Sequence, residues 1–88
     1  MDYPAFYKHM SELLMLIKSN LGNENAHAIV VLNDYMLLKG LYAEYEEVKT
    51  ILPLVEEKIK RSEDWEFVKE TYVPSLDEES KELIKNLL

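Results

Sequence analysis

Between Leu41 and Ile59 the apolar residues follow a spacing that suits a helix and little else. They recur at intervals of four, three, four, three and four residues: Leu41, Tyr45, Val48, Leu52, Val55 and Ile59. This is the a/d pattern of a helix that buries one seam. Pro53 lies off the seam, removes one backbone hydrogen bond and disfavours helical geometry at the residue before it. Because the seam keeps its phase across Pro53, we expect a kinked helix from 41 to 61 rather than two independent helices.

The segment from about Pro4 to Leu21 carries helix signals at both ends. Asp2 is a candidate N-cap, Pro4 stands near the first helical position, and Gly22 stands where a left-handed C-cap belongs. Most of its apolar residues recur at spacings of three and four: Phe6, Met10, Leu13, Leu14, Ile17 and Leu21. We therefore expect an amphipathic helix, followed by a tight loop.

The next segment, from residue 25 or 26 to Lys39, is apolar on almost every face. A helix with this pattern is buried all round. Its β-branched run also suits a strand, but no partner strand is apparent, so we expect a helix. Four or five short helices can hardly cover Val30, Val31, Tyr35 and Leu38 on every side at once, and an apolar strip left over would be a docking surface. Gly40 either separates this helix from the next or is a joint within one longer rod.

Two further helices are expected after residue 61. Ser62 is a candidate N-cap for the first, which Pro74 ends, and the capping box from Ser75 to Glu78 opens the second. Their apolar positions are Trp65, Val68, Tyr72, Leu76, Leu83, Ile84, Leu87 and Leu88. The chain ends on two leucines, which we expect to dock on the core or to be offered to a partner.

These patterns predict an all-α fold, a single-domain bundle of four to five helices over residues 1–88. The chain has only two glycines and three prolines, whereas β-sandwiches and barrels need frequent turns. At this length a chain buries only about 64% of its unfolded surface, which leaves one modest core.

The charge balance bears on the class of partner. Seventeen acidic against ten basic residues give a net charge of −7, which disfavours direct binding to nucleic acid and favours a protein partner with a basic surface. Nine of the ten bases are lysine, and glutamine and cysteine are absent. Such a composition is typical of thermophiles, although an AT-rich genome gives the same preference for lysine over arginine.

The longest uncharged, mostly apolar run covers eight residues, from Ala26 to Asn33, against roughly 20 needed to cross a bilayer. We therefore expect no membrane association of this kind. Residues 1–4 show no basic start and no apolar stretch follows them, so a secretory signal is not indicated. The expected location is cytoplasmic.

Reactive side chains are scarce, so we expect no enzyme: no catalytic residue, no cofactor and no metal. The chain has no cysteine, no nucleophile elbow and no glycine-rich phosphate loop. Glu24 and His27 have the Glu-x-x-His spacing of di-iron bundles, but the other ligands that such sites need are missing. Paired acids such as Glu46 and Glu47 point about 100° apart on a helix and are interpreted as solvated surface.

Interfaces favour large, rigid, amphipathic side chains near charge-poor stretches. The candidates for such a role are Trp65, Phe67, Tyr35, Tyr42, Leu38, Leu87 and Leu88. Trp65 and Phe67 are two positions apart and cannot share one helix face, so one of them is expected to be exposed. The sequence does not decide whether Trp65 belongs to the core or to an interface.

The leading hypothesis is a non-enzymatic protein-protein interaction module, a small acidic accessory subunit or adaptor of a larger complex. In size and in its Lys-, Glu- and Tyr-rich composition, the chain resembles the small helical accessory subunits of crenarchaeal B-family DNA polymerase holoenzymes. This resemblance implies a role in DNA replication, stabilising a polymerase. One alternative is an acidic viral or mobile-element inhibitor that blocks a nucleic-acid-binding protein. Another is a homo-oligomeric helical bundle.

Overall fold

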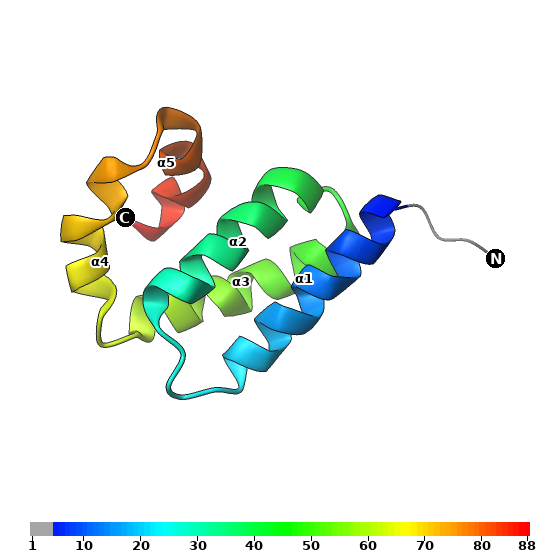
Figure 1. Ribbon diagram of the computed structural model, residues 1–88, viewed down its shortest axis with the longest axis horizontal. Coiled ribbons are helices and arrows are strands. Elements are labelled where there is room, and N and C mark those ends of the chain that lie inside the picture. Colours follow the sequence, from blue (N-terminus) through cyan, green and yellow to red (C-terminus); the bar gives the residue numbers. More distant parts are fainter. Residues whose placement is uncertain (1–4) are drawn as a thin grey trace.

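The computed structural model describes residues 5–88, and within them every regular element is a helix and none is a strand (Figure 1). The α-helices are α1 (Ala5–Leu21), α2 (Ala28–Tyr42), α3 (Glu46–Arg61), α4 (Trp65–Thr71) and α5 (Glu78–Ile84). Two 3-10 turns, η1 (Val73–Ser75) and η2 (Lys85–Leu87), follow α4 and α5. The expectation of an all-α bundle of four to five helices is confirmed.

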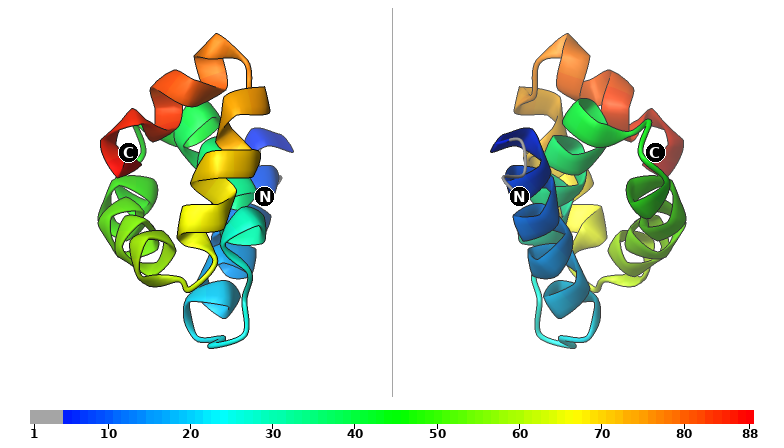
Figure 2. Two further views of the ribbon diagram at one scale, coloured as in Figure 1. Left: turned by 90° about the vertical axis from the view of Figure 1, so that its left-hand side faces the viewer. Right: turned by 90° about the vertical axis from the view of Figure 1, so that its right-hand side faces the viewer.

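The three longest helices run up, down and up along the length of the molecule, and α4 and α5 gather at one end of them (Figures 1 and 2). Of the five α-helices, α2 is the central one, because it packs against each of the other four. Its neighbours nevertheless lie on three sides only, and one side of α2 faces the viewer in Figure 1.

The core contains the middle of the apolar stripe that the spacing predicts in α1, since Met10, Leu13, Leu14 and Ile17 are buried, whereas Phe6 is exposed and Leu21 is only half-buried. The same holds for α3, where Val48, Val55 and Ile59 are fully buried. The remaining buried residues are Ala28, Val31, Leu32, Tyr35, Leu38, Tyr42, Ile51, Trp65, Val68, Val73, Ile84 and Leu87.

The predicted start of the third helix is wrong. The α2 helix runs through Gly40 to Tyr42, and a turn closed by the Tyr45 N–H donating to the Tyr42 carbonyl at 3.2 Å precedes α3. Leu41 is therefore an exposed residue of α2, and Leu52 is only half-buried. Past this turn α3 is one helix that continues through Pro53, as expected from the phase of its seam.

Gly40 is thus neither a separator of helices nor a joint in a longer rod. A Cβ atom at this position would lie 3.2 Å from Cδ1 of Leu83. The missing side chain lets α5 approach α2 closely, which is a packing role.

Three predicted helix ends are also wrong, and each for a local reason. No glycine in the described part of the chain has a positive φ, so Gly22 is not a left-handed cap. The Ser62 hydroxyl donates to the Lys58 carbonyl at 2.9 Å and so belongs to the end of α3. The Ser75 hydroxyl donates to Tyr72 in the η1 turn, and Asp77 caps α5 instead by accepting from the Ser80 N–H at 2.8 Å. That bond lowers the pKa of Asp77. The predicted cap at Asp2 and the role of Pro4 lie outside the described residues.

A polar network fastens the C-terminal segment to the central helix. The buried Tyr35 hydroxyl donates to Glu56 of α3 at 2.7 Å, and burial raises the pKa of Tyr35 well above its usual range. The Lys39 ammonium donates to the Leu83 carbonyl at 2.7 Å and to Asn86 at 3.2 Å. A cation is well placed at carbonyls near the end of a helix. This network explains why Leu87 is docked in the core.

Candidate interaction surface

The structure separates the predicted interface residues into two groups. Trp65, Tyr35, Tyr42, Leu38 and Leu87 lie in the core of the chain itself, and Trp65 is only 3% exposed. Phe67 and Leu88 are 67% and 63% exposed. The buried five fill the bundle and are not available to a partner in this conformation, whereas an interface role for the other two stays a prediction.

The central helix has an uncovered apolar side that sequence reasoning located only in general terms. Val30, Leu37 and Leu41 of α2 and Leu16 of α1 are each 47–55% exposed. We call these four residues the outer strip. The expectation that α2 is buried all round is therefore wrong, because its neighbouring helices leave this side open. The expectation of a leftover apolar strip describes what the structure contains, but of the residues named for it only Val30 is exposed, whereas Val31, Tyr35 and Leu38 are buried.

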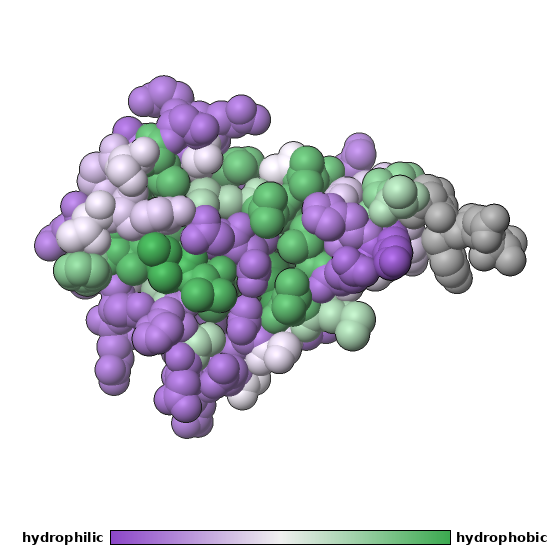
Figure 3. All heavy atoms as spheres, viewed as in Figure 1, coloured by the Kyte–Doolittle hydropathy of each residue, from purple (hydrophilic) through white to green (hydrophobic). Residues whose placement is uncertain are grey.

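The four residues of the outer strip share one side because of how α1 and α2 meet. The Asn20 side-chain amide of α1 donates to Oδ2 of Asp34 in α2 at 3.1 Å, which sets the two helices face to face at this level. Leu16 precedes Asn20 by one turn, and Val30 and Leu37 lie four residues before and three after Asp34. Figure 3 shows hydrophobic residues gathered in two groups over α2, with a hydrophilic band between them.

A carboxylate thus lies among exposed apolar residues. Burial raises the pKa of Asp34, and the hydrogen bond from Asn20 partly offsets this shift. A raised pKa in the folded state means that the Asp34 side chain stabilises the fold when it is a neutral carboxyl group. This contribution to stability is lost as the pH rises through the folded-state pKa. At neutral pH, burial therefore opposes the ionised form of Asp34.

Sequence reasoning missed Asp34, Leu16, Leu37 and Leu41 as site residues. The sequence does contain a signal for this side of the helix, since positions 30, 34, 37 and 41 are spaced four, three and four residues apart. It is hidden by the apolar residues on the other faces of the same segment. Only the packing of α1, α4 and α5 reveals which stripe is left open.

The other surface feature is an open hollow of about 1070 Å³ between the α1–α2 loop and the junction of α3 with α4. Its lining residues are Leu21, Glu24, Asn25, Ala26, His27, Leu54, Glu57, Lys58, Arg61, Ser62, Glu63 and Asp64. Charges of both signs line it, so it offers no single preference for an anion or a cation.

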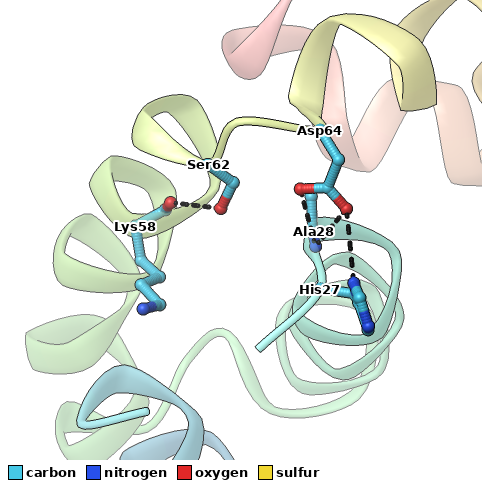
Figure 4. Close-up of polar contacts among 5 residues, drawn as sticks. All are labelled: His27, Ala28, Lys58, Ser62 and Asp64. Carbon is cyan, nitrogen blue, oxygen red and sulfur yellow. Dashed lines mark hydrogen bonds and ion pairs between the residues drawn. The ribbon is translucent and has the colours of Figure 1, made fainter. Parts of the chain in front are cut away.

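Several polar groups of the hollow form bonds that hold helix ends together (Figure 4). Both carboxylate oxygens of Asp64 accept from the Ala28 N–H, at 3.1 and 3.3 Å, so Asp64 caps the start of α2 from a distant part of the chain. Lys58 donates to the Asn23 carbonyl at 2.9 Å. His27 Nδ1 lies 3.9 Å from Asp64, which is too far for a hydrogen bond. These groups serve the fold rather than a ligand.

Glu24 and His27 both line this hollow. Within residues 5–88, however, no three metal-ligating side chains gather closely enough to hold an ion. Nor does any helix in that range combine the length and apolar character that a membrane span requires.

The acidic residues of α3 are mixed with basic ones. Arg61 pairs with Glu57 at 3.7 Å, as the helical spacing predicts, and Lys69 of α4 pairs with Glu66 at 2.9 Å. Such exposed pairs partly offset the acidic charge at these two places on α3 and α4. Comparison of the chain with protein-family models, with curated proteins and with solved structures found no match.

Proposed function

We propose that this chain is a small docking subunit, which binds a larger protein through the outer strip. The observation that carries the proposal is the exposure of Val30, Leu37, Leu41 and Leu16 on one side of a well-packed bundle. Single exposed leucines are ordinary, but several on adjoining turns of two helices are typical of an interaction surface. The polar network of Tyr35 and Lys39 holds α2 in place, so the strip is rigid and loses little entropy on binding.

The net charge of the chain defines the partner further. At −7, the chain repels acidic surfaces and attracts basic ones over distances of about one Debye length, roughly 8–10 Å. A second copy carries the same charge and is disfavoured as the occupant. We therefore propose a protein whose apolar surface is bordered by lysine and arginine. The resemblance in size and composition to polymerase accessory subunits gives one specific form of this proposal, in which the partner is a DNA polymerase.

Substitution of the outer strip tests this function. The tagged chain and its Leu37→Glu and Leu41→Glu variants are used to capture proteins from the source cell, first near physiological salt and then at about 1 M salt, where exposed charges are screened. We expect the wild-type chain to retain a partner at both salt concentrations. Each variant should capture at least about tenfold less of it, because a carboxylate would enter an apolar contact.

Leu54→Glu is the matched control. Leu54 is 58% exposed on α3, so the substitution makes the same chemical change at a similar exposure but on another helix. All three variants should keep their free energy of unfolding within about 0.5 kcal/mol of the wild type. Equal capture by Leu37→Glu and Leu54→Glu would overturn the proposal. Loss of the partner from the wild-type chain at high salt would assign the binding to the acidic surface instead.

A further inference from the structure

We propose that the outer strip receives one amphipathic helix of the partner, and that this helix places a lysine or arginine against the Asp34 carboxylate. The inference rests on the proposed function and names the element and the charge that the strip recognises. It is carried by the position of Asp34 within the strip and by the spacing of the residues around it.

The spacing favours a helix as the occupant. Val30, Asp34, Leu37 and Leu41 follow one another at intervals of four, three and four residues, which is the a/d pattern by which one helix packs along another. They span three turns of α2, or about 16 Å of helix axis. Partner helices that lie in such a contact present anchors at matching intervals of three and four residues. The strip has the regular geometry of one side of a helix pair.

The Asp34 carboxylate favours a partner helix that carries a lysine or arginine. Asn20 donates to Oδ2, and among residues 5–88 no basic side chain lies within ion-pair distance of Asp34. An ionised carboxylate can accept about four hydrogen bonds, whereas the half-buried Asp34 accepts one from the described residues, which leaves the exposed part of the group to solvent. A partner that covers Leu37 and Leu41 removes this solvent. Burying the charge without a counter-charge would cost more than the apolar contact contributes, whereas a lysine or arginine restores the lost hydrogen bonds.

A second copy of the chain cannot supply this base from its own strip. Two copies of α2 paired in parallel would set Asp34 against Asp34, and paired antiparallel they would set it against Leu37. The one lysine of α2, Lys39, is turned toward α5 and donates to the Leu83 carbonyl. A single polar residue within an a/d seam selects the partner and its register, which is the role that we assign to Asp34.

The test uses two synthetic helical peptides of about three heptads that differ at one position. Both carry apolar residues at every a/d position except the central one. That position is arginine in the first peptide and glutamate in the second. Binding to the full chain is measured by calorimetry at physiological salt. We expect the arginine peptide to bind at least about tenfold more tightly than the glutamate peptide. The Asp34→Asn variant keeps an oxygen that can accept from Asn20 but removes the charge, and should lose this preference.

Glu47→Gln is the control for net charge, because Glu47 is an exposed carboxylate on α3, away from the strip. This variant should keep the full preference. Burial disfavours the charged form of Asp34, so we expect Asp34→Asn to be about as stable as the wild type at neutral pH, which urea denaturation of the two proteins checks.

Equal affinities for the two peptides, or no binding of either up to about 1 mM, would overturn this inference. The docking function is judged separately by capture from the source cell. If Leu37→Glu abolishes capture while the arginine peptide shows no advantage, the docking function stands and the inference fails. If capture survives Leu37→Glu, both fail.

Discussion

Replacement of Val48 by aspartate is expected to unfold the chain. Val48 is fully buried in α3, within the single core that α1, α2 and α3 share. A carboxylate there would lose its hydration, and the side chains of this core are apolar, so no counter-charge is at hand. Buried unpaired charges belong to the substitutions that cost more than about 4 kcal/mol. Small domains have about 5–15 kcal/mol in total, and one of this size has little reserve.

The measurement is the helical circular dichroism signal of the purified variant at room temperature. Leu54→Asp is the control, since it places the same charge on an exposed position of the same helix and should leave the signal and the unfolding midpoint nearly unchanged. A soluble and fully helical Val48→Asp protein would refute the assignment of the α3 core seam. Leu52→Asp should have a smaller effect than Val48→Asp, because Leu52 is half-buried and its charge can reach solvent.

Replacement of Trp65 by alanine should lower the free energy of unfolding by about 3–5 kcal/mol. Trp65 begins α4 and is buried in the core, and the Lys69 ammonium lies 5.8 Å from the centre of its ring. The substitution removes the largest side chain of the chain's C-terminal half and leaves a cavity that seven residues of α4 can only partly close. Urea denaturation of the two proteins gives the difference directly.

Phe67→Ala is the natural comparison, because Phe67 lies on the same short helix with its ring exposed. It should change the free energy of unfolding by no more than about 0.5 kcal/mol. If the two substitutions had equal effects, the division of α4 into a buried side at Trp65 and an outer side at Phe67 would be incorrect.

The sequence predicts the helices better than their ends. Periodic apolar residues such as Met10 and Ile17, or Val55 and Ile59, depend only on which side of a helix meets the core, and this is a local property. Helix ends depend on bonds from elsewhere in the chain. Asp64 caps Ala28 from 36 positions away, which no local motif announces. The capping box at Ser75 gives way to Asp77 because Pro74 and the η1 turn engage the serine first.

The candidate interface is harder to predict, because the side chains that suit an interface also suit a buried core. The sequence favours Tyr35 and Trp65 because they are large and amphipathic, but these properties also suit them to the core of a small domain, where both lie. Leu37 and Leu41 are ordinary core residue types, and they became surface only because α2 is apolar on more sides than its neighbours can cover. A surplus of apolar surface can be predicted from sequence, whereas its position requires the packing.

The central claim is that the outer strip is covered when the chain is in its complex. Hydroxyl-radical footprinting tests this most directly, since it reports the solvent access of individual side chains. The free chain is compared with the chain in the complex captured from the source cell. We expect oxidation of Leu16, Leu37 and Leu41 to slow at least about tenfold in the complex, as burial excludes water from apolar contacts. Leu54 should react at the same rate in both. Unchanged oxidation of the strip in an intact complex would contradict the account.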